Sequence, residues 1–181
     1  MNSNPLPFIL LAYKMTHDSF KIAERAIKTK EAKQRLLQRT CVEKLTLTDA
    51  LCMIKEANKE SDALFVLNIW EVFERFLKND LQERGKLLRD TKPPALGNSI
   101  YQHFKKEVEF WRPGKILNFF KDSLFKEQTN LIGHAKQILA YRDWVAHGKN
   151  PKTPPSSDIK PLAAYNTLNE IVETLLANPP F

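Results

Sequence analysis

The segment from Tyr141 to Asn150 combines two side chains that can cleave a phosphodiester without a metal ion. Arg142 supplies a permanent positive charge for a phosphate, and His147 supplies a group that gains and loses a proton near neutral pH. Asp143 lies four residues before His147, hence on the same face of a helix, where it can orient the imidazole. Arg142, Asp143 and His147 are therefore the candidate catalytic residues of this chain.

Arg142 falls within an apolar stripe of the helix that we predict from about Gln128 to His147. The apolar members of this stripe are Leu131, Ala135, Ile138 and Val145. A charge on such a face is costly unless something pairs with it. Two explanations are open. Arg142 either reaches a carboxylate elsewhere in the bundle or extends its stem toward water, or it binds a ligand phosphate through two parallel hydrogen bonds.

Gly148 is expected just after the end of this helix, which leaves His147 in its last turn. His147 then lies roughly 140° around the helix from Arg142, so the two side chains diverge. One helix alone does not aim both groups at a single phosphate. An alternative interpretation is a surface pair of Asp143 and His147 that only caps the helix.

Charge is distributed unevenly along the chain of 181 residues, whose formal net charge is +7. Between Lys14 and Lys44 there are nine basic residues and four acidic ones, so this segment supplies most of the surplus. A basic face attracts polyanions such as RNA through phosphate neutralisation and counterion release. A simply solvated helix face explains the same pattern.

Metal, cofactor and membrane sites are not expected. Cys41 and Cys52 stand eleven positions apart with no histidine at ligand spacing, so neither a zinc site nor a disulfide framework is indicated. The apolar run from Phe8 to Tyr13 is much shorter than the ~20 residues of a membrane span. We therefore expect a cytoplasmic protein without a membrane anchor.

Helical periodicity and breakers predict an all-α fold. Prolines interrupt the chain at Pro93–Pro94 and again between Gly148 and Pro161. Between the breakers we predict helices over Thr16–Arg39, from Thr48, over Ser61–Leu88, Asn98–Trp111, Gln128–His147 and Pro161–Ala177, with an aromatic piece at Phe119 and Phe120. These elements suit an up-and-down bundle of four or five main helices with extra short helices, forming a single domain over residues 1–181.

The sequence Arg142-Asp143-Trp144-Val145-Ala146-His147 resembles the signature of the HEPN superfamily. These all-α domains carry an arginine, a polar residue directly after it, and a histidine after four to six intervening residues. The block from Trp70 to Leu77 also looks like the earlier core helix of the RiboL-PSP-type branch. The resemblance covers about residues 45–178, and residues 1–44 form a basic helical extension.

The resemblance implies a metal-independent endoribonuclease that acts as a homodimer, with the two Arg–His motifs meeting in one cleft. His147 would move the proton of the RNA 2′-hydroxyl and Arg142 would stabilise the phosphoryl charge, leaving 2′,3′-cyclic phosphate and 5′-hydroxyl ends. Such enzymes serve in toxin–antitoxin modules, antiviral defence and stress responses, which implies an antitoxin or regulatory partner.

One position departs from the branch that a nucleotidyltransferase-type antitoxin modifies. That branch has a tyrosine two positions after the histidine, whereas this chain has Lys149. Lys149 and Asn150 suit contact with the RNA backbone better.

Two further hypotheses compete with catalysis. The chain could be a non-catalytic helical dimer that binds RNA or a protein. It could also be a subunit that another protein activates by docking on the apolar faces around Trp70 and Phe119–Phe120.

Overall fold

The structure is a computed structural model that describes residues 3–180, and within this range it is all-helical. Seven α-helices and two short 3-10 helices occur, with no strand among the described residues. They are α1 (Leu6–Ile27), α2 (Lys30–Leu36), α3 (Leu47–Arg84), η1 (Gly85–Asp90), α4 (Pro94–Phe110), α5 (Pro113–Lys121), η2 (Lys126–Gln128), α6 (Thr129–Ala146) and α7 (Pro161–Ala177). The predicted all-α class is confirmed.

The chain forms two compact units. One contains residues 7–65, and the other contains residues up to Leu6 together with those from Val66 onward. The division falls inside α3, between Phe65 and Val66, so this helix contributes to both units. Within residues 3–180, no helix combines the length and the apolar character needed to cross a bilayer.

In the unit of residues 7–65, a small core gathers around the end of α1. Its buried members are Ala26, Ile27, Leu37, Val42, Ala50 and Ile54. Nearer the middle of α1, the hydroxyl of Tyr13 donates a hydrogen bond to Asp62 Oδ1 (2.8 Å), and the Tyr13 ring lies 4.3 Å from that of Phe65. Burial first, and then the hydrogen bond to Asp62, raise the pKa of Tyr13 above its usual range.

The single helix predicted over Thr16–Arg39 is wrong at both ends. Helix α1 begins at Leu6 and ends at Ile27, and α2 follows after a break at Lys28 and Thr29. The break lets Leu37 and Val42 fold back against Ile27 and join the same core. Apolar burial at this turn therefore outweighs the helical propensity of the lysine-rich sequence.

Helix α3 is one continuous helix of 38 residues, not the two helices predicted from Thr48 and Ser61. Its cap is Thr46, whose Oγ1 accepts the N–H of Asp49 (3.2 Å) and whose hydroxyl donates to the Asp49 carboxylate (2.7 Å). The capping chemistry predicted around Ser61 is not used, because α3 continues through this residue and leaves no free backbone N–H groups to cap.

In the other unit, the second half of α3 supplies the central apolar stripe. Its members are all buried: Val66, Trp70, Phe73, Leu77 and Leu81. Facing apolar residues of α7 are buried too: Ala164, Leu168, Ile171, Val172 and Leu175. At the end of α3, Arg84 pairs with Asp80 (2.6 Å) and donates to the carbonyl oxygens of Leu175 and Asn178 (3.2 and 2.7 Å). These contacts tie the C-terminal ends of α3 and α7 together.

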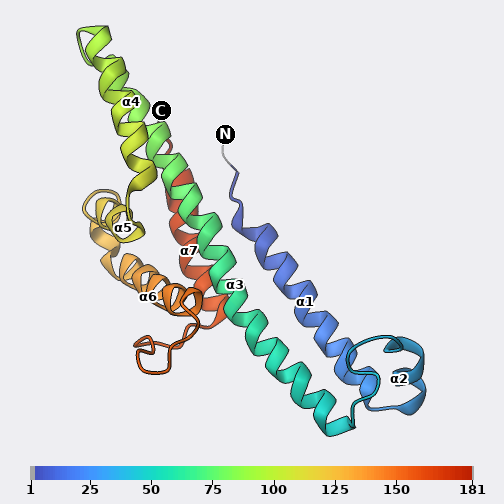
Figure 1. Ribbon diagram of the computed structural model, residues 1–181. Helices are drawn as coiled ribbons and strands as arrows, with labels where there is room; N and C mark the ends of the chain where they lie inside the picture. The colour runs from blue at the N-terminus through green and yellow to red at the C-terminus, as the bar shows by residue number, and fades with distance from the viewer. Residues whose placement is uncertain (1–2, 181) are drawn as a thin grey trace. The chain divides into compact units, whose positions relative to one another are not determined.

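Helices α4 to α7 complete this unit. Helix α4 packs on η1 and folds back along the last turns of α3, as Figure 1 shows. Glu109 of α4 accepts hydrogen bonds from Arg75 and Gln82 of α3 (3.0 and 2.8 Å). Helix α5 packs on α6, which in turn packs on α7. Helix α6 differs by one residue at each end from its predicted range, and α7 has its predicted range.

Gly97 allows α4 to approach the backbone at the end of η1 closely. A Cβ atom at this position would lie 2.5 Å from the carbonyl oxygen of Arg89 and 2.6 Å from that of Thr91. Backbone cannot move aside easily, so we expect Gly97→Ala to lower the free energy of unfolding by about 1–3 kcal/mol.

Gly133 of α6 is the control, because a Cβ there meets nothing within 4 Å. Gly133→Ala should be neutral or stabilise by about 0.5–1 kcal/mol. Urea unfolding of both variants checks this, and a stabilised Gly97→Ala protein would refute the close approach.

Candidate active site at the end of helix α6

Helix α6 carries Arg142 on its buried side, as the apolar stripe predicts. Ala135, Ile138 and Val145 are buried on this side, while the Arg142 side chain keeps 22% of its surface exposed. The aliphatic stem of Arg142 therefore lies along the core, and its guanidinium reaches the edge of the packed region.

The guanidinium of Arg142 is paired with two carboxylates. Its Nη2 donates to Oε1 of Glu71 on α3, and its Nη1 donates to Oδ1 of Asp143 (3.0 Å). Burial alone lowers the pKa of Arg142, but the hydrogen bonds and charges of Glu71 and Asp143 outweigh it and raise the pKa above its usual value. The sequence left open whether Arg142 pairs with a carboxylate or with a ligand phosphate, and the structure shows that it pairs with carboxylates.

One atom of this guanidinium has no partner. Among the described residues, the Arg142 Nε and the Asn58 Oδ1 are buried polar side-chain atoms without a hydrogen bond. A buried donor that is left unpaired costs free energy relative to one that is bonded. Arg142 therefore retains hydrogen-bonding capacity beyond its contacts with Glu71 and Asp143.

Asp143 does not orient His147 as predicted from their spacing. Its carboxylate accepts from Arg142, and no hydrogen bond or ion pair joins the Asp143 and His147 side chains in the part of the chain that the structure describes. Only backbone connects the two residues, because the His147 N–H donates to the Asp143 carbonyl oxygen (3.0 Å). The expected Asp143–His147 pair does not form for two reasons. His147 lies outside helical geometry (φ −94°, ψ 21°), and the permanently charged guanidinium of Arg142 binds the Asp143 carboxylate instead.

His147 is exposed and is held by a well-defined helix end. The N–H of Gly148 donates to the carbonyl oxygen of Val145 (3.1 Å), and that of Lys149 donates to Trp144 (2.9 Å). These two bonds form a Schellman motif with Gly148 in the C′ position, as the sequence predicts. The indole N–H of Trp144 also donates to the carbonyl oxygen of Asn150 (2.8 Å). The backbone that presents His147 is therefore fixed on both sides.

The predicted RNA-binding residues Lys149 and Asn150 belong to this same turn. Lys149 has a positive φ of 56°, and the Asn150 side chain accepts the N–H of Lys152 (3.0 Å). Asn150 thus helps to shape the loop after α6, a role that the sequence did not reveal.

Gly148 lies at φ +82°, where residues with a Cβ are strained. We expect Gly148→Ala to lower the free energy of unfolding by about 1–2 kcal/mol, because no surrounding atom obstructs the added methyl group and only the backbone strain remains. Gly148→Asn should cost less, since asparagine tolerates this conformation. Thermal unfolding of the two variants compares them directly. Equal stability of wild type and Gly148→Ala would contradict the helix end described here.

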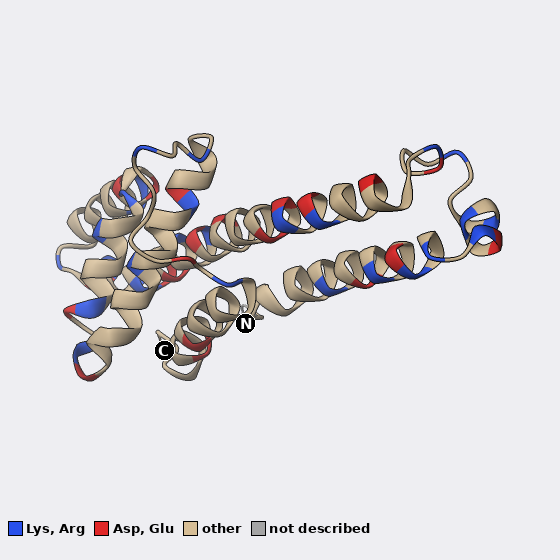
Figure 2. Cartoon of the chain, turned by 90° about the horizontal axis from the view of Figure 1, so that it is seen from below, with Lys and Arg blue, Asp and Glu red and all other residues tan. Residues whose placement is uncertain are grey.

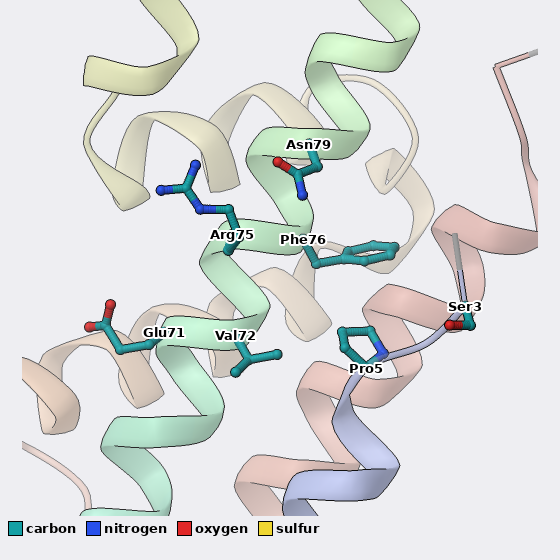
Figure 3. A pocket seen from close by; sticks show the side chains of 7 residues that line it. All are labelled: Ser3, Pro5, Glu71, Val72, Arg75, Phe76 and Asn79. Carbon is teal, nitrogen blue, oxygen red and sulfur yellow. The ribbon is translucent and has the colours of Figure 1, made fainter. Parts of the chain in front are cut away.

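Arg142 opens on a pocket of about 490 Å³ beside α5. Its lining includes Arg112, Lys115, Asn118, Leu139 and Asp143. Glu71, the partner of Arg142, lines a different pocket of about 510 Å³ on α3, together with Arg75, Phe76 and Pro5. Figure 3 shows Glu71 and Arg75 projecting from successive turns of α3 to the same side, away from Phe76 and Pro5. The ion pair between Glu71 and Arg142 therefore contributes one residue to each pocket.

Basic residues are also frequent in the unit of residues 7–65, where Figure 2 shows them along α1 and in α2. Two of them pair with an acidic residue three positions earlier: Lys21 with Asp18 (2.9 Å) and Lys59 with Glu56 (2.7 Å). Both interpretations of this segment, an RNA-binding face and a solvated helix, fit its geometry.

Glu71 is the site residue that sequence reasoning missed. It lies directly after the buried Trp70, at the margin of the stripe, and half of its side chain is exposed (51%). An exposed glutamate on a helix is unremarkable in a sequence, and only the packing of α6 shows its partner. No group of three or more metal-ligating side chains occurs among residues 3–180.

Comparisons of this chain with protein-family models, curated proteins and solved structures find no match.

Proposed function

We propose that this protein is a metal-independent endoribonuclease of the HEPN type, with Arg142 and His147 as its catalytic residues. The observation that carries the proposal is the end of α6. It presents an exposed histidine on a fixed turn, and it holds an arginine whose side chain lines a pocket. A titratable group and a permanent cation so presented suit cleavage of a phosphodiester.

In the proposed reaction the 2′-hydroxyl oxygen attacks the adjacent phosphorus. The bond from O2′ to phosphorus forms while the bond from phosphorus to O5′ breaks. One imidazole takes the proton of the 2′-hydroxyl, and a protonated imidazole gives a proton to the departing O5′. Arg142 stabilises the charge that grows on the phosphoryl oxygens. The products are a 2′,3′-cyclic phosphate and a 5′-hydroxyl.

Two features favour a site shared by two copies of the chain. The proposed reaction uses two imidazoles, and Arg142 and His147 of one chain point in different directions from the helix. A two-fold axis near the end of α6 would bring two arginines and two histidines to one phosphate. Light scattering at micromolar concentration tests this part, and we expect a dimer. A strictly monomeric protein would contradict the shared site.

The test of the activity incubates the purified protein with structured and unstructured RNA in the presence of a chelator. We expect cleavage that does not need magnesium, and we expect the same RNA sequence made as DNA to remain intact. Cleavage that appears only with added magnesium would overturn the proposal. Toxin, antiviral defence and stress roles all fit such an enzyme, with an antitoxin or regulatory protein as a partner.

A second candidate is a non-catalytic helical module that binds RNA or protein. The pairing of Arg142 with Glu71 and Asp143 favours it, because a structural arginine needs no ligand phosphate. RNA binding without cyclic-phosphate products would distinguish this candidate from the enzyme.

A further inference from the structure

Two neighbouring pockets beside α5 share a lysine. Lys115 lines the pocket of Arg142, and it also lines a second pocket of about 500 Å³ on α4. Trp111 and Arg112, which connect α4 to α5, contribute to one pocket each: Trp111 to the second and Arg112 to the first. Both volumes lie in the ~300–1,000 Å³ range of small-molecule sites. The two pockets therefore adjoin at Lys115.

The first pocket has an uncompensated positive charge. Arg112, Lys115 and Arg142 line it, and its one lining carboxylate, Asp143, is already paired with Arg142. Neither Arg112 nor Lys115 forms an ion pair with a carboxylate within residues 3–180. Lys136 adds charge nearby, because its Nζ donates to the lining Asn118 (2.6 Å). Such a pocket attracts phosphate groups.

The second pocket is mainly aromatic and apolar. Its lining includes Trp111, Phe104, Ile100 and His103, with Glu107 as its one carboxylate. The Trp111 ring centroid lies 6.0 Å from that of Phe104 in an edge-to-face arrangement, which fixes the ring. Lys115 Nζ lies 4.0 Å from the centroid of Trp111, so a cation and an aromatic face meet where the pockets join.

We infer that the two pockets form a track for single-stranded RNA, with backbone phosphates on Arg112 and Lys115 and an unpaired base against Trp111. Aromatic rings that alternate with basic side chains bind single strands, because every base offers a face for stacking and every linkage a phosphate. A paired base cannot enter the second pocket, so the track selects unpaired RNA. This inference rests on the proposed function, because it takes the bound RNA to be the substrate. The phosphate next to those on Arg112 and Lys115 would then lie at Arg142.

The test measures binding of a fluorescent single-stranded oligonucleotide of 2′-O-methyl RNA to the full-length protein by anisotropy. Because the blocked 2′ oxygen prevents cleavage, the readout is independent of catalysis. Trp111→Ala should weaken binding roughly 5- to 150-fold, the range of base stacking on an aromatic ring. Trp111→Phe keeps an aromatic face and should bind nearly as well as the wild type.

Arg112→Ala combined with Lys115→Ala tests the phosphate contacts. Both residues are exposed, so the fold should survive the change. Losing two phosphate contacts should make the plot of log affinity against log salt shallower by about 1.4. Lys106→Ala is the matched control, because Lys106 is exposed on α4 and lines neither pocket.

The track is refuted if the pocket variants bind as Lys106→Ala does, or if duplex RNA of the same sequence binds as tightly as the single strand. Failure of the track is distinguishable from failure of the proposed function. If the wild type cleaves RNA in chelator and the Trp111 and Arg112/Lys115 variants bind normally, the track is refuted and the proposed enzyme is supported. If those variants bind more weakly and the wild type does not cleave RNA, the track is supported and the proposed enzyme is refuted.

Discussion

Replacing His147 by alanine is expected to slow RNA cleavage by about 10²–10⁴-fold, the usual contribution of a positioned acid or base. The fold should not change, because the side chain is exposed and the Schellman bonds of this turn are made by backbone atoms. Single-turnover cleavage of a labelled RNA, alongside thermal unfolding, measures both quantities on the same preparation.

His134→Ala is the matched control for this prediction. His134 is an exposed histidine of α6, roughly three and a half turns before His147, and it lines none of the pockets described above. It should cleave at the wild-type rate. If His147→Ala retains full activity, the imidazole has no part in the chemistry.

Replacing Arg142 by alanine is expected to slow cleavage by about 10²–10³-fold, the effect of removing one donor that stabilises a developing oxyanion. Stability should fall by about 1–2 kcal/mol, because the change removes the aliphatic stem that packs along the core as well as the ion pairs. The loss should stay below that of a fully buried pair, because Glu71 and Asp143 keep 51% and 49% of their side-chain surface exposed and water solvates both carboxylates once the arginine is gone. Cleavage rate and urea unfolding together test the prediction.

Two further variants separate a catalytic from a structural role for Arg142. Arg142→Lys keeps the charge but loses the planar donor geometry, so its rate should lie between those of wild type and Arg142→Ala. Glu71→Gln removes the charge of the partner and leaves the guanidinium in place, so it should keep measurable activity. A loss of about 3–5 kcal/mol in Arg142→Ala would instead show a buried structural pair and support the binding module.

The sequence predicted the elements with strong local signals. Pro161 defined the start of α7 and Gly148 the end of α6, because proline and glycine restrict or permit backbone angles within one or two residues. The helical character of the segment from Ser61 onward followed from its periodicity, and Trp70 and Phe73 of that segment are fully buried. The break between α1 and α2 was missed because it depends on the tertiary contacts of Ile27. The continuity of α3 past Ser61 was missed because a serine that suits a helix start is also tolerated inside a helix.

The candidate site was predicted in part for the same reason. Spacing along one helix located Arg142 on a buried face and His147 in an exposed turn. It could not reveal that Glu71, on a distant part of the chain, supplies the carboxylate, nor that Asp143 would serve Arg142 in place of His147. The pocket that joins Arg142 to Arg112 and Lys115 arises from the packing of α5 on α6, which no local pattern encodes.

The most direct measurement of the central claim is an end-group analysis of RNA cleaved in chelator. The substrate is an oligonucleotide with one preferred cut, compared with a copy that carries a single 2′-deoxynucleotide immediately 5′ to the cleaved phosphate. We predict 2′,3′-cyclic phosphate and 5′-hydroxyl ends from the first substrate and no cut at the modified position in the second. A 3′-hydroxyl with a 5′-phosphate, or cleavage that survives the 2′-deoxy substitution, would contradict the proposed function.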